Sequence, residues 1–308
     1  MRWKFSSTTT TSATMRYIII LSSLPALQTQ VSTHNKKTVI FMNKKIGFIG
    51  VGNMATAIMG GMLKSGFIAP SNINIFDLAK EKCEDFISQG VVFCDSADDV
   101  TQNSDYIVLA VKPQNYAEVL QSLSHIDCKD KVFVSIAAGI SIAFIREQLS
   151  HNVKVVRVMP NTPLLLSKGA SAMCKSDNLT EDEFSVVKDM FSLSGVVEIF
   201  DESHMNEIIA VNGSSPAFFY LFAKAMVEYA VSCGIDGDKA LNLVCATYEG
   251  AAAMMRESGD DIDTLIQKVS SKGGTTIEAL NSFNENKVTD IIKEAMTKCT
   301  NRAQELGK

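Results

Sequence analysis

A glycine-rich turn, Gly50-Val51-Gly52, separates a short apolar run from a helical pattern. With Ala55 it gives the spacing G-x-G-x-x-A, and the apolar run Ile46–Ile49 before it is long enough for a buried strand. Gly50 would make the turn, and Gly52 would let the backbone approach a pyrophosphate, which the N–H groups at the start of the helix would bind. The pattern predicts dinucleotide binding, although glycine turns that bind nothing can share this spacing.

An acidic residue, Asp77, ends a second predicted strand over residues 72–77. It lies 22 residues beyond Ala55, close to where an acid accepts hydrogen bonds from an adenosine ribose. Alternatively, Asp77 caps a helix that starts at Leu78. Because Lys80 and Lys82 follow, a 2′-phosphate could still find a cation, and the sequence leaves NAD and NADP both open as cofactors.

A third strand end belongs to the same predicted edge. The apolar strand over residues 106–111 runs into Lys112 and Pro113, and ligands of open α/β sheets lie at the carboxyl ends of strands. The residues that we expect to bind the cofactor are therefore Ile49, Gly50, Val51, Gly52, Asn53, Met54, Asp77, Ala110, Val111, Lys112 and Pro113.

A second glycine turn runs into a helical pattern at Ser271-Lys272-Gly273-Gly274-Thr275-Thr276. Hydroxyls beside the free N–H groups of a helix N-terminus make a site for a small anion such as a substrate carboxylate. The alternative is an ordinary N-cap, with Thr275 or Thr276 capping the helix after a glycine turn. A dinucleotide turn in one domain and a small-anion turn in the next favour the substrate site.

Strands and helices alternate along the first two thirds of the chain, and from about His204 only helices are predicted. This order predicts an α/β fold, in which a doubly wound, mostly parallel Rossmann domain over residues 43–203 precedes an all-α domain over 204–308. The predicted elements include a helix over 79–89, strands over 132–136 and 153–159, and edge strands over 170–174 and 195–200.

The helical domain contains a segment, Ala217–Phe222, that is apolar at every position. A helix that is apolar around most of its circumference is buried around most of it. A domain of roughly 100 residues cannot bury such a helix alone, so we expect a homodimer through this domain.

Composition excludes several classes of protein. The chain has 308 residues, 46% of them hydrophobic, a formal net charge of -5 and no basic stripe, which argues against a nucleic-acid partner. Its seven dispersed cysteines and four scattered histidines predict reduced thiols in the cytoplasm and no metal site.

The first 42 residues differ from the rest because they contain no acidic residue. Their apolar run Tyr17–Leu21 is too short to span a membrane. Three interpretations of this segment are open. It is a transit peptide, which would make the location organellar, or a secretory signal, or sequence upstream of a true start at Met42. We expect an accessory or mis-assigned extension that is disordered and dispensable.

Five motifs occur in an order that resembles pyrroline-5-carboxylate reductase, and the resemblance runs from Met42 nearly to the C-terminus. They are Gly47-Phe48-Ile49-Gly50-Val51-Gly52-Asn53-Met54, Ala110-Val111-Lys112-Pro113-Gln114, Met159-Pro160-Asn161-Thr162-Pro163, Gly213-Ser214-Ser215-Pro216-Ala217 and Gly273-Gly274-Thr275-Thr276. The resemblance implies reduction of 1-pyrroline-5-carboxylate to L-proline with NAD(P)H, the last step of proline synthesis. It also implies a dimerisation domain whose helices interlock between subunits, and often a ring of dimers.

The resemblance also assigns roles within the second turn. Backbone N–H groups of Gly274, Thr275 and Thr276, with Ser271 beside them, would hold the substrate carboxylate. The Thr276 hydroxyl would form a hydrogen bond with the ring nitrogen of the substrate. In the family an acidic residue is a second hydrogen-bond partner of this nitrogen, and Glu257 is its counterpart here.

Two departures from the family pattern matter. Lys272 stands where the family usually has proline, which removes rigidity and adds a cation near an anionic substrate. Asp77-Leu78 replaces small or hydroxylated residues that hold the NADP phosphate, which argues against a strong NADP preference.

Two other functions compete. A 3-hydroxy-acid dehydrogenase shares a similar opening motif, but its catalytic Lys and Asn pattern is absent at Asn212–Pro216. A non-catalytic dinucleotide-binding sensor would need no anion turn, and the stretch Gly273–Thr276 counts against it.

Overall fold

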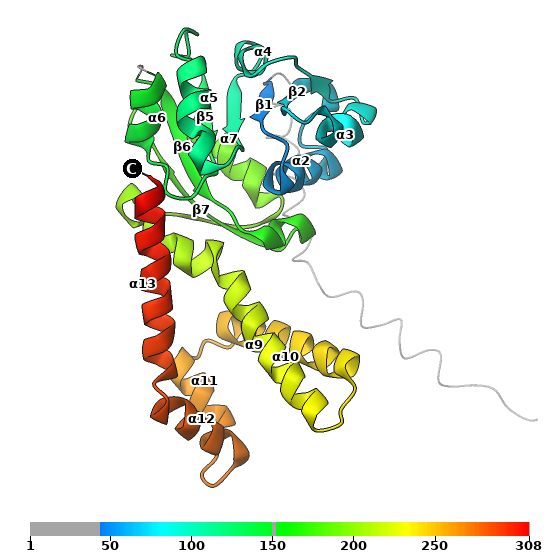
Figure 1. Cartoon of the computed structure of the whole chain (residues 1–308), viewed down its shortest axis with the longest axis vertical. Coiled ribbons are helices and arrows are strands. Elements are labelled where there is room, and N and C mark those ends of the chain that lie inside the picture. The colour runs from blue at the N-terminus through cyan, green and yellow to red at the C-terminus, as the bar shows by residue number, and fades with distance from the viewer. Residues whose placement is uncertain (1–43, 150–151, 308) are drawn as a thin grey trace, which may run out of the picture. The chain divides into compact units, whose positions relative to one another are not determined.

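The computed structural model describes residues 44–149 and 152–307, and the extension predicted over residues 1–42 lies outside this part of the chain. The first two thirds of the described chain form an eight-stranded sheet with the strand order β3-β2-β1-β4-β5-β6-β7-β8 (Figure 1). The strands are β1 (Ile46–Ile49), β2 (Ile73–Phe76), β3 (Val92–Phe93), β4 (Tyr106–Leu109), β5 (Val132–Ser135), β6 (Lys154–Met159), β7 (Gly169–Lys175) and β8 (Gly195–Ile199).

Strands β1 to β6 are parallel, and β7 runs antiparallel to β6 with β8 parallel to β7. The order 3-2-1-4-5-6 is that of doubly wound dinucleotide-binding sheets, so the fold predicted for this part is confirmed. The prediction that 170–174 is an edge strand is wrong, because β8 covers β7. Four successive residues of β7, Ser171–Cys174, are buried, which fits an internal strand.

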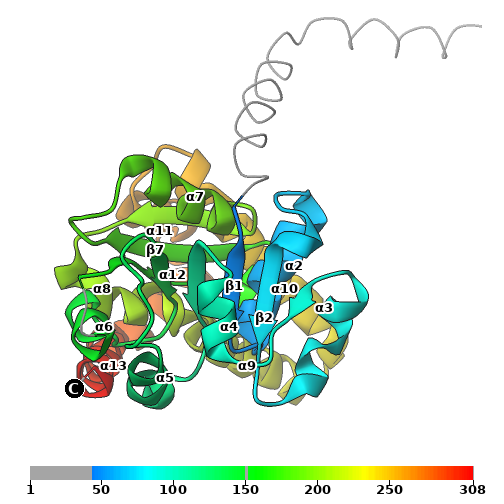
Figure 2. The same ribbon diagram turned by 90° about the horizontal axis from the view of Figure 1, so that it is seen from above.

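Helices flank the sheet (Figure 2). They are α2 (Asn53–Ser65), α3 (Glu84–Ser88), α4 (Ala97–Gln102), α5 (Tyr116–Ser122), α6 (Ile142–Leu149) and α7 (Glu181–Ser192). The single helix predicted over 79–89 is wrong, because a 3-10 segment over Lys80–Cys83 precedes α3. Asp77 explains the difference, since its carboxylate accepts the Ala79 N–H at 2.9 Å and competes with helical hydrogen bonds.

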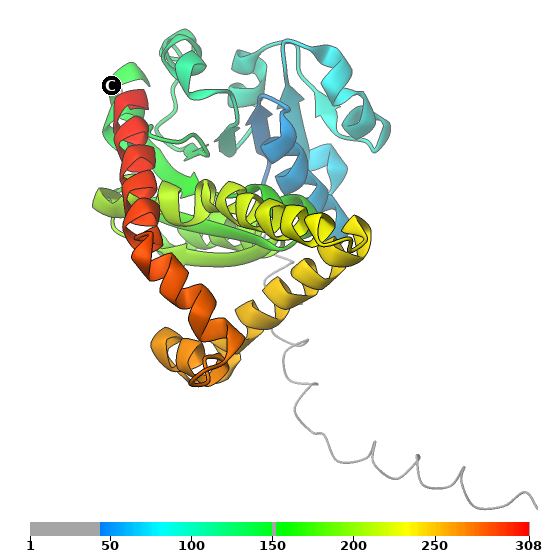
Figure 3. The same cartoon turned by 60° about the horizontal axis from the view of Figure 1, so that its bottom comes forward.

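From Met205 on, the described chain is helical, as expected (Figure 3). Helices α9 and α10 pack side by side, and α13 runs back to pack against α8 and the π-helical turn Ile209–Gly213. The helices are α8 (Met205–Ile208), α9 (Ser215–Ser232), α10 (Gly237–Glu257), α11 (Ile262–Val269), α12 (Thr275–Glu285) and α13 (Val288–Leu306). None of the described helices combines the length and apolarity that a membrane crossing requires.

Helix α9 leaves its apolar side chains uncovered within one copy of the chain. Phe219 is 57% exposed, Leu221 66% and Tyr229 72%. Among all residues of this described helix, Pro216 alone is buried. Since exposed apolar surface of this extent marks an interaction site, the observation fits the expected dimer.

Candidate functional site

The first glycine turn joins the carboxyl ends of three strands. Gly50 has φ +95° and donates its N–H to the Phe76 carbonyl of β2 at 2.8 Å. A Cβ on Gly50 would lie 2.9 Å from the Ala110 carbonyl, just beyond β4. Glycine is required at this position for both its backbone angle and the close approach.

Gly52, by contrast, has open space beside it. It is the N-cap of α2, and a Cβ there would meet no atom of the described chain within 4 Å. The first helical bond runs from the Thr56 N–H to the Gly52 carbonyl, so Asn53, Met54 and Ala55 have no helical partner for their N–H groups. The first turn of α2 also has no acidic residue. These features fit a pyrophosphate at the start of α2.

Asp77 connects β2 to the glycine turn. Its Oδ2 accepts the Val51 N–H at 2.8 Å, and its Oδ1 accepts the Ala79 N–H and the Lys82 ammonium at 3.2 Å. Partial burial opposes ionisation, but these bonds and the Lys82 charge outweigh it, so the pKa of Asp77 lies below its ordinary value. The alternative that Asp77 caps a helix beginning at Leu78 is wrong, because the 3-10 segment starts at Lys80.

The residues after β4 lie next to the first turn. The Ala110 N–H bonds the Ile49 carbonyl at 2.9 Å, Val111 is half-buried, and Lys112 is exposed just before Pro113 begins a 3-10 turn. These positions share the carboxyl edge with the glycine turn. The structure therefore brings all the predicted cofactor-binding residues to one edge of the sheet.

Buried Tyr116 links the carboxyl ends of two neighbouring strands by hydrogen bonds. Its hydroxyl donates to the Leu109 carbonyl at 2.6 Å and accepts the Ser135 hydroxyl at 3.2 Å. Burial raises the pKa of Tyr116 well above its ordinary value, which keeps the hydroxyl protonated as a donor. The ends of β4 and β5 are thereby joined.

The second glycine turn is a β-turn that leads directly into α12. The Gly274 N–H bonds the Ser271 carbonyl at 2.9 Å, and Gly273 has φ +74° at the third position of the turn. The N-cap of α12 is Gly274, and no described side chain caps this helix. The alternative that Thr275 or Thr276 is the cap is therefore wrong. Thr275 is exposed and Thr276 half-buried in the first turn of the helix.

Glu257 is the last residue of α10 and is exposed. Among the described residues, no hydrogen bond or ion pair joins Glu257 to the turn at 271–274 or to Thr276. Helix α11 packs on α10 and α12 packs on α13. Figures 1 and 3 place α11 and α12 away from β1 and its glycine turn, so a single copy does not bring the two predicted sites together.

Two asparagines near the carboxyl edge were missed as candidates. The Asn161 Nδ2 donates to the Asn212 carbonyl at 3.1 Å, and the Asn212 Nδ2 donates to the Met159 carbonyl at 2.8 Å. The signal available in the sequence was one asparagine within the motif Met159–Pro163 and another directly before the motif Gly213–Ala217, but nothing in the spacing pairs them.

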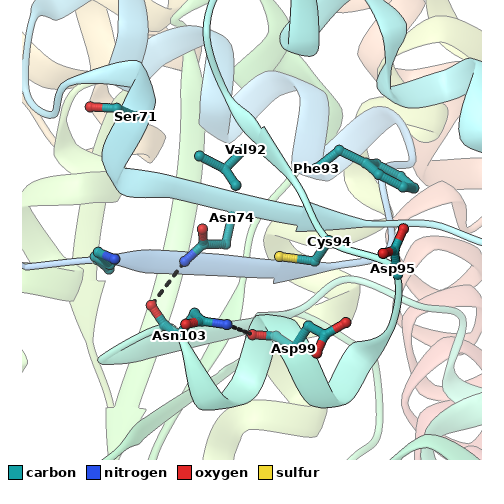
Figure 4. A pocket seen from close by; sticks show the side chains of 9 residues that line it. Ser71, Asn74, Val92, Phe93, Cys94, Asp95, Asp99 and Asn103 are labelled. Carbon is teal, nitrogen blue, oxygen red and sulfur yellow. Dashed lines mark hydrogen bonds between the residues drawn. The ribbon is translucent and has the colours of Figure 1, made fainter.

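A hollow of about 340 Å³ lies elsewhere on the sheet (Figure 4). Lys45 and Ser71, which precede β1 and β2, place it at the amino edge of these strands. Asn74, the buried polar residue in its wall, donates to the Asn103 carbonyl at 2.9 Å and to the Ser104 hydroxyl at 3.0 Å. These hydrogen bonds explain why the Asn74 amide is buried, so it does not indicate a ligand site in this hollow. Within the described ranges, no group of three or more His, Cys, Asp or Glu residues could hold a metal ion.

Comparison with protein families matches both halves of the chain. A model described as pyrroline-5-carboxylate reductase dimerisation matches residues 202–306. Another, described as NADP oxidoreductase coenzyme F420-dependent, matches residues 45–139.

Individual relatives match over nearly their whole length. The chain is 36% identical over 268 residues to pyrroline-5-carboxylate reductase from Escherichia coli, which covers 87% of this chain and 100% of that protein. The Plasmodium falciparum pyrroline carboxylate reductase structure with NADP bound has a TM-score of 0.79 at 27% identity. A pyrroline-5-carboxylate reductase structure from Coxiella burnetii has a TM-score of 0.78 at 30% identity. Each structural match covers 86% of this chain and 99% of the other.

Proposed function

The chain belongs to the pyrroline-5-carboxylate reductase family, and from this premise we propose how its two glycine turns divide the reaction between them. The reaction adds a hydride from NAD(P)H to the carbon of the C=N bond in 1-pyrroline-5-carboxylate and a proton to the nitrogen. It gives L-proline and the oxidised cofactor. The observation that carries the proposal is the 36% identity over 268 residues to a relative of this activity, which this match covers over its whole length.

The first turn holds the dinucleotide. The start of α2 binds the pyrophosphate through the backbone N–H groups that follow Gly52, and Asp77 faces the adenosine ribose. Ala110–Pro113 border the nicotinamide half, because they follow β4 on the other side of β1. The remaining cofactor contacts are those predicted from Ile49 to Met54. The bound cofactor supplies the hydride.

The second turn holds the substrate. Its carboxylate sits at the N-terminus of α12, on N–H groups of Gly274, Thr275 and Thr276, with Ser271 beside it. The uncapped start of α12 supports this role, because its donors are not used by a side chain. The Thr276 hydroxyl bonds the ring nitrogen, and Glu257 is the proposed second partner of that nitrogen. The chain thus contributes orientation and hydrogen bonding rather than a reactive group of its own.

The dimerisation domain implies a homodimer. Because one copy separates the two turns, we propose that each active site combines the dinucleotide turn of one subunit with the substrate turn of its partner. The exposed apolar face of α9 supports this arrangement, since a second copy would cover it. The dimers are further proposed to form a ring. All seven cysteines are free, which fits the proposed cytoplasmic location.

The test is to incubate the purified protein with NADPH or NADH and 1-pyrroline-5-carboxylate. We expect loss of the reduced-nicotinamide absorbance with stoichiometric formation of proline. A 3-hydroxy acid offered with the oxidised cofactor serves as the control for the dehydrogenase alternative. Turnover of the hydroxy acid without turnover of the imine, or binding without turnover of either, would overturn the proposal.

A further inference from the structure

A clasp of two asparagines, Asn161 and Asn212, joins the sheet to the start of the helical part of the chain. Asn212 lies in the π-helical turn Ile209–Gly213, which the Ser214 N–H closes on the Ile209 carbonyl at 2.8 Å. Single π turns inside helices are rare and often mark functional positions. This turn places the Asn212 side chain against the loop that follows β6.

The clasp closes that loop at both ends. The Asn212 Nδ2 donates to the carbonyls of Met159 at 2.8 Å and Ala170 at 3.0 Å. In the reverse direction, the Asn161 Nδ2 donates to the Asn212 carbonyl, and the Asn161 Oδ1 accepts the Ala170 N–H at 2.9 Å. Residues 160–168 are therefore held as a closed loop between the last residue of β6 and the start of β7.

The orientation of the Asn212 amide follows from its partners. Two carbonyl oxygens can be bonded only by the NH₂ group, so Oδ1 points away from them. Within the described structure this Oδ1 is buried and has no hydrogen-bond partner. An unpaired buried acceptor costs free energy, so the bonds of Nδ2 are made at the expense of this oxygen.

The closed loop connects the helical part to the dinucleotide edge. Its 3-10 segment, Thr162–Leu166, packs against α2, the helix that begins at the first glycine turn. The side chain of Met159 also lies beneath the π turn, since a Cβ on Gly213 would be 2.4 Å from the Met159 methyl carbon. The π turn is thus joined through one loop to the end of β6 and to α2.

We infer that Asn212, with Asn161, is a positioning residue for hydride transfer. The second half of a doubly wound sheet, here β4 to β6, borders the nicotinamide half of a dinucleotide. By fixing the end of β6 and the loop on α2, the clasp sets the position of the nicotinamide edge relative to the helical part that carries the substrate turn. The inference rests on the proposed function and adds two residues that act through the loop rather than on the reactants.

The test compares Asn212→Ala and Asn161→Ala with Asn74→Ala. Asn74 is also a buried asparagine whose Nδ2 has two acceptors, but it lies at the amino edge of the sheet. We expect all three variants to lower the melting temperature. For the two clasp variants, we also expect kcat to fall roughly tenfold or more, because hydride transfer is sensitive to small displacements. Their dinucleotide Kd should stay within about twofold of the wild-type value, since the pyrophosphate site is untouched.

A deuterium isotope effect, measured with the reduced cofactor labelled at the transferred position, separates positioning from loss of folded protein. In the clasp variants it should be at least as large as in the wild type, because the chemical step is slowed. Equal loss of kcat in Asn74→Ala and Asn212→Ala, or unchanged kcat in both clasp variants, would overturn the inference. If Asn212→Ala does not fold, Asn212→Ser, which keeps one donor, and Asn161→Ala decide by the same readouts. A wild-type protein inactive on the imine would refute the proposed function instead.

Discussion

The Asp77 carboxylate and the Val51 N–H are joined by a 2.8 Å hydrogen bond, which ties the acid after β2 to the middle of the glycine turn. The side chain of Asp77 is 12% exposed, and Lys82, whose side chain is 51% exposed, lies against it. A 2′-phosphate at this position would therefore meet a carboxylate that is held ionised, with one cation beside it.

The first prediction concerns the cofactor. We expect a modest preference for NADPH or a preference for NADH, because the Asp77 charge opposes the phosphate. Asp77→Ser should raise the NADPH-to-NADH ratio of kcat/KM by about tenfold, whereas Lys82→Ala should lower it. A wild-type preference for NADPH above about a hundredfold, roughly 2.7 kcal/mol, would contradict this interpretation of Asp77.

The carboxyl edge of the sheet was predictable from sequence because its elements are local. Sequence patterns predicted β1, β4, β5 and β6 near their observed positions, and the spacing from Gly50 to Ala55 identified the turn that follows β1. The break between residues 79 and 89 was not predictable, since it depends on where the Asp77 carboxylate points once β2 lies beside β1.

The candidate site divides in the same way. The two glycine turns were recognisable in the sequence, because a backbone with positive φ favours glycine. The pairing of Asn161 with Asn212 joins residues far apart in sequence, and it depends on a π turn that no periodicity predicts. The distance between the two glycine turns is likewise a property of how α9 to α13 are arranged.

The second prediction uses backbone strain at Lys287, the N-cap of α13, which has φ +52°. A residue with a Cβ is disfavoured there, whereas glycine is not. Lys287→Gly should stabilise the protein by about 0.5–1 kcal/mol after the entropy of the unfolded chain is counted. The measurement is the denaturation midpoint, and Lys287→Ala, which keeps the Cβ, is the control. Equal midpoints for the two variants would show that the conformation carries no strain.

The third prediction concerns Lys272, which occupies the second position of the turn between Ser271 and Gly274. Proline is favoured at this position of a turn with a positive-φ glycine next. Lys272→Ala removes the ammonium charge together with its aliphatic stem, and we expect KM for the substrate to rise by roughly twofold to fivefold at low salt and less at high salt. Lys272→Pro also removes the charge but restricts the unfolded chain, which should add about 0.4–1 kcal/mol of stability. If KM changes in neither variant at any salt concentration, the Lys272 charge does not act on the substrate.

The fourth prediction tests the hydroxyl of Thr276. Thr276→Val keeps the shape and removes the proposed partner of the ring nitrogen, so kcat/KM for 1-pyrroline-5-carboxylate should fall by about tenfold to a hundredfold, roughly 1.4–2.7 kcal/mol. Since Gly274 and not a threonine is the N-cap, the melting temperature should hardly change. The dinucleotide Kd should also stay the same. A variant that changes only in melting temperature would refute the substrate contact.

The last prediction tests whether each active site is shared between two subunits. Gly52→Val should block the dinucleotide without disturbing the fold, because a Cβ at Gly52 meets no atom of the described chain within 4 Å. Thr276→Val should impair the substrate turn. When the two variants are produced together, about half of the dimers contain one subunit of each kind, if pairing is random.

In such a mixed dimer, a shared arrangement leaves one site with an intact dinucleotide turn and an intact substrate turn. The other site carries both defects. Activity should then return to about one quarter of the wild-type value, since half of the dimers have one good site of two. If each site lies within one chain, every site in the mixture carries one defect, and the mixture should be no more active than the average of the two variants. Purifying the mixed dimer with two different affinity tags makes the comparison direct, because its expected activity is then about half that of the wild type.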